Sequence, residues 1–133
     1  MGSRRRSREF ALQILFESDF NPEGLREALA RVTAEQDLNE EVASFLERLI
    51  EGYVSYKENL DEKLESLSNN WKMNRMASVD RNLLRLGVLE IAHFEDVPKT
   101  VAINEYLEIA KKFGTSDSAG FINGILDKVS KDK

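Results

Sequence analysis

The sequence contains no cysteine, a single histidine, His93, and only two prolines among its 133 residues. Without cysteine the chain forms neither a disulfide bond nor a thiolate metal site, and it has no cysteine nucleophile. One histidine cannot build a histidine metal cluster, and the sequence has no catalytic serine-histidine-carboxylate arrangement and no glycine-rich phosphate loop. We therefore expect a protein that is not an enzyme, that holds no metal or other cofactor, and that works in the reducing cytoplasm.

Long apolar runs are also missing from the sequence. No stretch of about 18 consecutive apolar residues occurs, so we expect no membrane-spanning helix. The basic start leads into an amphipathic stretch, which is not the pattern of a signal peptide. Hydrophobic residues make up 41% and charged residues 32% of the chain, the balance of a soluble globular protein. A chain of this length fits one domain, residues 1–133.

Apolar residues recur at intervals of three and four, whereas the alternation typical of strands is absent. This pattern predicts an all-α fold of about seven helices, packed as two bundles. The polar run at residues 68–70 predicts the boundary between an N-terminal half, 1–68, and a C-terminal half, 69–133. We expect helices over residues 4–19, after Asn21 and Pro22, after Asn39 as far as residue 67, within 71–77, from Ser78 to about 95, before Gly114, and after Thr115 or Ser116.

The net charge of −5 argues against a nucleic-acid-binding protein, but the charges are unevenly distributed. The first eight residues hold four of the 19 basic residues and no acid, which leaves 15 basic and 24 acidic residues, a net of −9, in the other 125. Guanidinium groups bind phosphates bidentately and stack on bases, so this cluster favours RNA binding. The alternative is a solvated tail that only aids solubility. The four arginines are Arg4, Arg5, Arg6 and Arg8.

Phe121 is a second candidate, because it flanks the apolar stripe of the last expected helix and follows Gly120. A nucleic-acid base could stack on a ring in that position. A flanking phenylalanine could equally close the edge of a core, and the spacing does not decide between the two.

Two stretches of the chain resemble the NusB family of transcription antitermination factors. The first is RRRSREFALQILF, residues 4–16. The second is longer and includes DRNLLRL at 80–86, DVP at 96–98, VAINE at 101–105 and FINGILD at 121–127. The motifs occur in the family's order along nearly the full chain, while residues 22–70 fit by pattern only.

The resemblance implies two helical bundles and an RNA-binding adaptor. Such a protein would bind boxA-type single-stranded RNA together with NusE, a small-subunit ribosomal protein, within the RNA polymerase antitermination complex that supports ribosomal RNA synthesis. The family often has glutamate at position 80 and also uses tyrosine at position 16, so this chain has a shorter acid and lacks a hydroxyl. The implied RNA-binding residues are Arg4, Arg5, Arg6, Arg8, Phe16, Asp117 and Phe121, and the implied NusE contact is Asp80.

Three alternatives remain open. A purely protein-binding helical scaffold would bind NusE and gain nothing from RNA. A NusB-like module also begins some ribosomal RNA cytosine methyltransferases, but those need a catalytic cysteine and a second α/β domain, so this chain would have to be a fragment. A homodimer could hide the basic end, although no motif predicts one.

Overall fold

The computed structural model describes residues 2–67 and 72–132, and every regular element within them is a helix. The all-α prediction is confirmed, and the expected number of about seven is close to the six α-helices and two short 3₁₀ helices described. None of the described helices is both long and apolar enough to cross a membrane. The elements are α1 (Ser3–Phe20), η1 (Pro22–Gly24), α2 (Leu25–Glu35), α3 (Glu40–Leu67), η2 (Met73–Arg75), α4 (Ser78–His93), α5 (Lys99–Phe113) and α6 (Ser118–Lys131).

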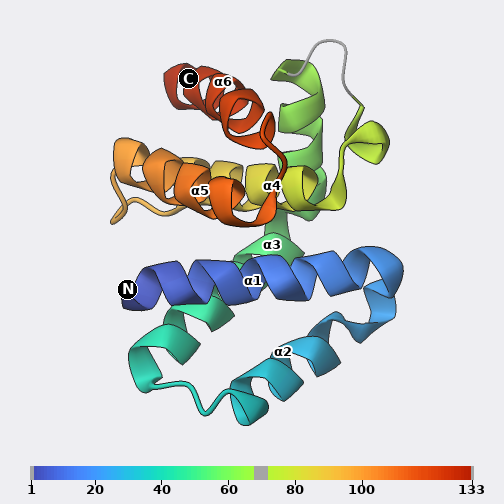
Figure 1. Ribbon diagram of the computed structural model, residues 1–133, viewed down its shortest axis with the longest axis vertical. Coiled ribbons are helices and arrows are strands. Elements are labelled where there is room, and N and C mark those ends of the chain that lie inside the picture. Colours follow the sequence, from blue (N-terminus) through green and yellow to red (C-terminus); the bar gives the residue numbers. More distant parts are fainter. Residues whose placement is uncertain (1, 68–71, 133) are drawn as a thin grey trace.

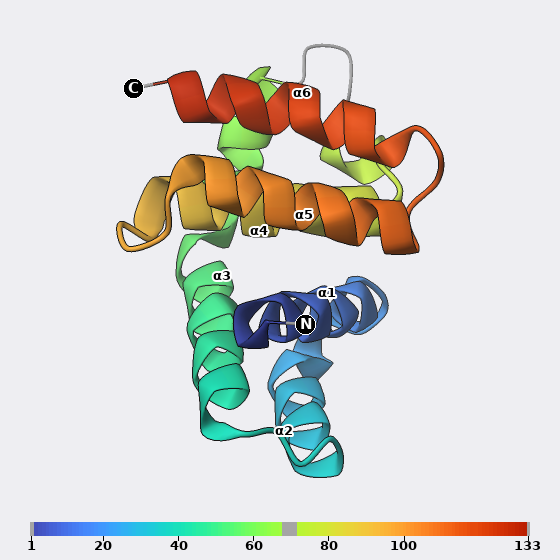
Figure 2. The ribbon, with the colours of Figure 1, turned by 60° about the vertical axis from the view of Figure 1, so that its left-hand side comes forward.

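The helices form two tiers (Figure 1). The lower tier holds α1, α2 and the first part of α3, and the upper tier holds α4, α5, α6 and the end of α3 (Figure 2). All the buried apolar side chains described, except that of Val42, join into one connected core. The expected boundary at residues 68–70 lies outside the described residues, so the division into two halves at that point stays a prediction. Because α3 contributes to both tiers, it ties them into one body.

The start of the long helix α3 is fixed as the sequence predicts. The side-chain oxygen Oδ1 of Asn39 accepts a hydrogen bond of 3.0 Å from the backbone N–H of Val42. This bond satisfies one of the free N–H groups of the first turn, and Glu40 and Glu41 place negative charge beside the positive end of the helix dipole. Asp37, with φ of 45°, reverses the chain just before this cap.

Two glycines allow α4 to lie close to its neighbours in the core. A Cβ atom at Gly87 would come within 2.7 Å of Leu126 on α6, and one at Gly52 would come within 2.9 Å of Leu89 on α4. Either approach is too short for a side chain to fit without movement of the leucine. Leu89 and Leu126 are fully buried, so these crossings keep α4 centrally placed in the upper tier.

Helix α1 is bound to the upper tier at both of its ends. Near the start, the guanidinium of Arg8 lies 2.7 Å from Glu90 of α4. Near the end, Asp19 accepts hydrogen bonds from Arg81 at 2.7 Å and from Asn82 at 2.8 Å, both on α4. Two separate anchors prevent α1 from rotating about its axis, and they therefore fix which of its residues face outward.

Candidate functional site

The arginines at the start of α1 divide into residues turned into the protein and residues turned out. Arg8 is only 2% exposed. Its Nε and Nη2 atoms donate to the two oxygens of Glu90 at 2.8 and 2.7 Å, and its Nη1 lies 3.3 Å from Glu105 of α5. The hydroxyl of the fully buried Tyr106 donates to the same glutamate, Glu90. We call Arg8, Glu90, Glu105 and Tyr106 the inner cluster.

Burial and pairing compete in setting the charge state of the inner cluster. Burial, the largest single influence, would lower the pKa of Arg8, but the hydrogen bonds to Glu90 and the nearby charges of Glu90 and Glu105 together outweigh it and hold the pKa above its ordinary value. Burial also raises the pKa of Tyr106 well above 10, and the neighbouring Glu90 adds to this effect. Arg8 is therefore a permanent cation and Tyr106 a neutral hydrogen-bond donor. The inner cluster has no side chain free to meet a ligand.

Arg5 and Arg4 are more accessible, and each already has a carboxylate partner. The Nη2 atom of Arg5 lies 2.5 Å from Glu105, which is the main reason that the pKa of Glu105 is lowered. The Nη2 atom of Arg4 lies 3.2 Å from Asp96, on the connection between α4 and α5. Asp96 is shared with Arg48 of α3 at 2.5 Å. We call Arg4, Arg48 and Asp96 the outer cluster.

Arg6 differs from the other three, because it has no carboxylate partner among the described residues. Its guanidinium lies 5.8 Å from the centre of the Phe10 ring, within range of a cation–π contact. It lies at the edge of an open groove of about 510 Å³ between α1 and the ends of α4 and α5. The groove is lined by Arg6, Glu9, Phe10, Leu12, Gln13, Phe16, Val79 and Phe113.

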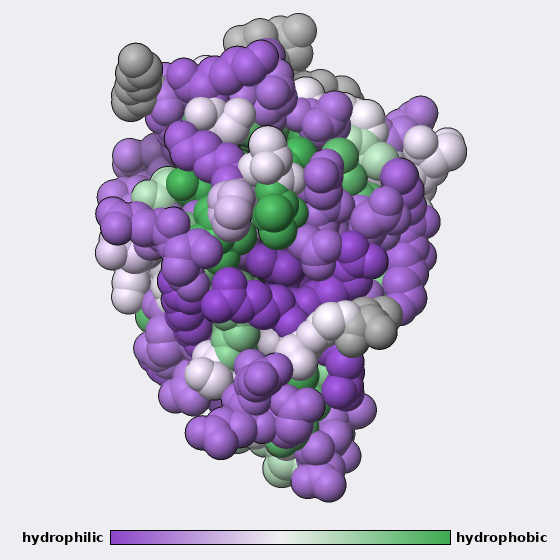
Figure 3. Space-filling view, turned by 90° about the vertical axis from the view of Figure 1, so that its left-hand side faces the viewer, coloured by the Kyte–Doolittle hydropathy of each residue, from purple (hydrophilic) through white to green (hydrophobic). Residues whose placement is uncertain are grey.

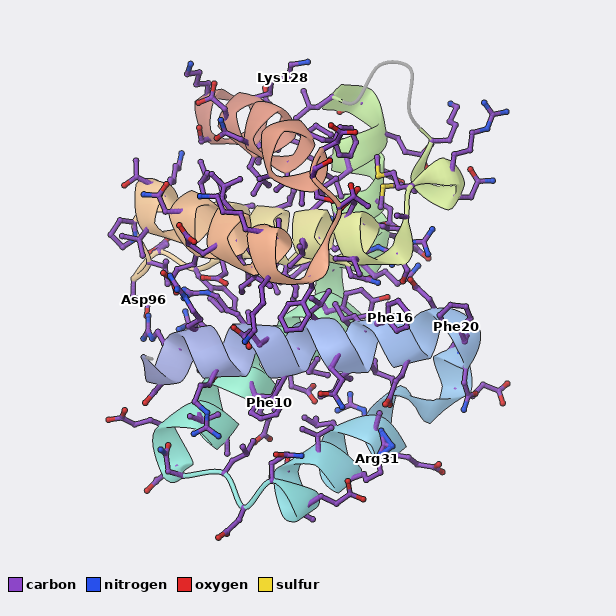
Figure 4. All side chains as sticks on the ribbon, in the orientation of Figure 1. Phe10, Phe16, Phe20, Arg31, Asp96 and Lys128 are labelled. Atoms are coloured by element: carbon purple, nitrogen blue, oxygen red, sulfur yellow. The ribbon has the colours of Figure 1, made fainter. Side chains whose placement is uncertain are left out.

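The groove presents exposed aromatic rings, which a monomeric protein normally buries. Phe16 is 39% and Phe113 47% exposed. Phe20, 74% exposed, packs against Phe16 with ring centres 5.3 Å apart (Figure 4). At the rim, Lys112 pairs with Glu9 at 3.0 Å. Flat apolar rings beside cations suit a ligand that has both planar and anionic groups.

Asp80 lies in the first turn of α4, next to Val79 of the groove wall. One of its carboxylate oxygens, Oδ1, is buried and has no hydrogen-bond partner among the described residues. The Nε of the neighbouring Arg81 is in the same condition. Buried polar atoms without a partner are rare in folded proteins. Both atoms belong to the first turn of α4, beside the groove wall.

Asp117 and Phe121 are brought together on the first turn of α6. Asp117 is exposed at the position before the helix, and its carbonyl oxygen accepts a bond of 3.2 Å from the backbone N–H of Phe121. Phe121 is half-buried and packs against the core, so its placement fits the core-edge alternative while leaving part of the ring accessible. Only residues 114–116 lie between Phe113 at the groove and Asp117.

Three residues of the groove and the outer cluster, Phe10, Phe113 and Arg48, were not among the sequence candidates. Phe10 and Phe113 follow the apolar spacing of their helices, and nothing in that spacing shows that α1 and α5 leave a gap beside them. Arg48 gave no signal either, because its partner Asp96 is distant in the sequence. All three are recognised only once the helices are placed together.

The fold and the groove define an all-helical protein built to bind another molecule. The comparisons with known proteins give it a family. The chain belongs to the NusB family, whose model matches residues 5–131. It is 45% identical over 130 residues to the transcription antitermination protein NusB of Bdellovibrio bacteriovorus, with 97% of this chain and 96% of that protein covered. It is 49% identical over 129 residues to the protein of that name from Desulfitobacterium hafniense, with 96% and 87% covered.

Solved structures agree with this assignment. NusB of T. maritima superposes with a TM-score of 0.91 at 34% identity, covering 97% of this chain and 91% of that one. NusB solved with NusE and double-stranded RNA superposes with a TM-score of 0.89 at 25% identity, covering 98% of each chain. The relatives are antitermination proteins rather than enzymes, so the prediction that this chain is not an enzyme is confirmed by its family.

Proposed function

We propose that this protein is a transcription antitermination factor that binds boxA-type single-stranded RNA together with NusE. In this role it joins the RNA polymerase antitermination complex in the cytoplasm and supports transcription of ribosomal RNA genes. The groove along α1, with Arg6 at its edge and exposed rings in its wall, is the observation that carries the proposal. The antitermination relatives and the solved complex of NusB with NusE and RNA support it.

In this proposal the arginines have unequal roles. Arg6 is not paired with a carboxylate among the described residues and binds an RNA phosphate directly. Arg4 and Arg5 first release their carboxylate partners in the protein, Asp96 and Glu105, and then bind a phosphate. Arg8 stays buried and keeps the start of α1 in place. Bases stack on accessible ring surface at Phe16 and Phe121, and the exposed Asp117 faces the same RNA.

NusE docks in this proposal at the start of α4. An aspartate cannot attract phosphate, but Asp80 is only partly buried, and its carboxylate can accept a hydrogen bond from a donor on another protein. Replacing Asp80 with asparagine removes one acceptor and should weaken NusE binding about tenfold. Isothermal titration calorimetry with purified NusE measures this loss. Asp127→Asn, on the exposed side of α6, is the matched control and should leave NusE binding unchanged.

The central test is a titration of fluorescently labelled boxA-like RNA with the protein, with and without NusE. Scrambled RNA and double-stranded RNA serve as competitors. We expect selective binding to the single strand, tightened by NusE and weakened between about 50 and 200 mM salt. Weak binding that ignores both RNA sequence and NusE would leave the helical scaffold as the better account, and a homodimer would show itself in the same samples by sedimentation.

Two substitutions locate the RNA on the protein. Arg6→Ala should weaken RNA binding and reduce the salt slope by about 0.7, the share of one phosphate contact to a single strand. Phe121→Ala should lower RNA affinity by about 1–3 kcal/mol if a base stacks there. If thermal stability falls instead while RNA affinity holds, Phe121 closes the core and does not contact RNA.

A further inference from the structure

The outer cluster lies at the side of the molecule where α1 begins, away from the groove. Arg48 of α3 donates to both oxygens of Asp96, at 2.5 and 3.1 Å, and Arg4 of α1 donates to one of them at 3.2 Å. One carboxylate therefore serves two guanidinium groups from two different helices. All three side chains are well exposed to solvent.

Buried aromatic rings hold the two arginines of the outer cluster in place. The guanidinium carbon of Arg48 lies 3.9 Å from the centre of the Phe94 ring, and that of Arg4 lies 4.5 Å from the centre of the Phe45 ring. The two rings are themselves packed edge to face, with centres 5.9 Å apart. Because this support does not depend on Asp96, the two guanidiniums keep their places if the carboxylate leaves. They are preorganised donors.

A hollow of about 450 Å³ adjoins the outer cluster and gives a ligand access to it. It is lined by Ser3, Ser44, Phe45 and the two arginines of the cluster, Arg4 and Arg48, whereas Asp96 is not part of its wall. Glu41 also lines it and limits its net positive charge. The hollow is therefore suited to one anionic group that replaces Asp96 at close range, and less suited to attracting a polyanion from a distance.

The position of the cluster connects it with the groove. Figure 4 shows Asp96 above the start of α1, at the seam between the tiers. On the corresponding face, Figure 3 shows a band of strongly hydrophilic residues across the middle of the molecule. Arg4 and Arg6 are two residues apart in α1, so their side chains leave the helix on nearly opposite sides. A single RNA strand that contacts Arg6 reaches the outer cluster by crossing the first turn of α1.

We propose that the outer cluster is a second phosphate-binding site for the same RNA, in which a backbone phosphate displaces Asp96 and binds Arg48 and Arg4. The proposal rests on the proposed function and adds Arg48, on a helix outside the arginine-rich start, to the RNA-binding residues. No covalent bond changes in this exchange: one oxyanion replaces another on the same N–H donors.

The competing explanation is that the cluster only clamps α1, α3 and the α4–α5 connection together. The two explanations predict opposite changes in RNA affinity for Asp96→Asn. Arg48→Ala and Asp96→Asn break the same ion pair, so a clamp responds to both in the same direction. A phosphate site responds in opposite directions, because one substitution removes a donor for the phosphate and the other removes its competitor.

The experiment measures binding of the labelled boxA-like RNA by fluorescence anisotropy over a range of salt concentrations. Arg48→Ala should weaken binding about tenfold and reduce the salt slope by about 0.7. Asp96→Asn should tighten binding about fivefold, since it removes a negative charge beside the phosphate. Arg48→Lys keeps the charge without the planar fork and should fall between wild type and alanine. Arg26→Ala, which breaks an exposed ion pair with Glu51 elsewhere on α3, is the matched control and should change nothing.

Thermal melts establish that each variant is folded before it is titrated. The site is disproved if Arg48→Ala leaves affinity and salt slope unchanged, or if Asp96→Asn weakens binding as Arg48→Ala does. If Arg6→Ala weakens binding in the same series, the proposed function survives that failure. If the wild-type protein does not bind the RNA at all, the proposed function and this site fail together.

Discussion

The inner and outer clusters use the same chemistry at the same end of α1, with opposite consequences. Both join arginines of α1 to carboxylates of the upper tier. In the inner cluster the pair of Arg8 with Glu90 is shielded from water, and Tyr106 completes the hydrogen bonding. In the outer cluster Asp96 and its two arginines stand in solvent. A buried pair cannot exchange its partner, whereas an exposed one can.

The difference follows from solvation. Separating a buried pair leaves a charge without either water or a partner, which costs several kcal/mol. Separating an exposed pair costs little, because water hydrates both groups. Within one arginine-rich segment, burial therefore decides which residues hold the fold and which remain available to an anionic ligand.

Arg8→Ala has the largest effect that this comparison predicts. It leaves Glu90 buried with only the hydroxyl of Tyr106, and it should lower the free energy of unfolding by about 3–5 kcal/mol. Urea denaturation followed by circular dichroism measures the change. Arg5→Ala, which removes a half-exposed guanidinium from the same helix, is the control and should cost clearly less. Equal losses for the two variants would show that burial does not separate their roles.

Tyr106→Phe sharpens the comparison within the inner cluster. It removes the hydroxyl that donates to Glu90 but keeps the ring and the pair with Arg8. The expected loss is about 1.5–3 kcal/mol, the range for a hydrogen bond to a charged group. The same urea experiment applies. A loss as large as that of Arg8→Ala would mean that the tyrosine, and not the arginine, is the main partner of the buried glutamate.

The sequence carried a signal for Arg8 that the charge pattern obscured. Arg8, Ala11, Leu12 and Leu15 are spaced three, four and seven residues apart, which places the arginine on the buried stripe of α1. An arginine on such a stripe must find a carboxylate inside the protein. The helices, the cap at Asn39 and the family could be predicted in the same way, because each depends on local spacing or on contiguous motifs.

The outer cluster and the groove have no such signal. Arg48 and Asp96 are 48 residues apart and meet only because α3 crosses the connection between α4 and α5. Phe113 follows the apolar face of α5, yet it is exposed because the helix ends beside the groove. Contacts of this kind depend on how the helices pack, which periodicity within one helix does not reveal.

A third test uses pH, since the pKa of Glu105 is lowered, chiefly by the hydrogen bond from Arg5. The folded protein keeps this carboxyl ionised more strongly than the unfolded chain does. The ion pair therefore contributes fully to stability at any pH above about 4.5, the ordinary pKa of a glutamate. This contribution is lost as the pH falls below that value. Glu105→Gln should flatten the loss of stability between pH 5 and 3, seen in urea midpoints at each pH. An unchanged acid profile would assign the loss to other carboxyls.

The same pH titration distinguishes the contribution of Glu105 from that of Asp96. The pKa of Asp96 is also lowered, and the main cause is the hydrogen bond from Arg48. Asp96 is exposed, so salt screens its interaction, while the more enclosed Glu105 is screened less. Asp96→Asn should therefore leave the acid profile nearly unchanged at physiological salt concentration. The part of the profile that Glu105→Gln removes should persist when the salt concentration is raised.

The smallest expected effect is that of Asp96→Asn on stability at neutral pH. The substitution breaks both ion pairs of the outer cluster, but Arg4 and Arg48 keep their ring contacts and become hydrated, so the melting temperature should stay within experimental error. Differential scanning calorimetry measures it beside Arg8→Ala as the positive control. A clear fall in melting temperature would make the outer cluster a structural clamp like the inner one. An unchanged value means that any gain in RNA affinity by this variant reflects the freed arginines and not a change in the fold.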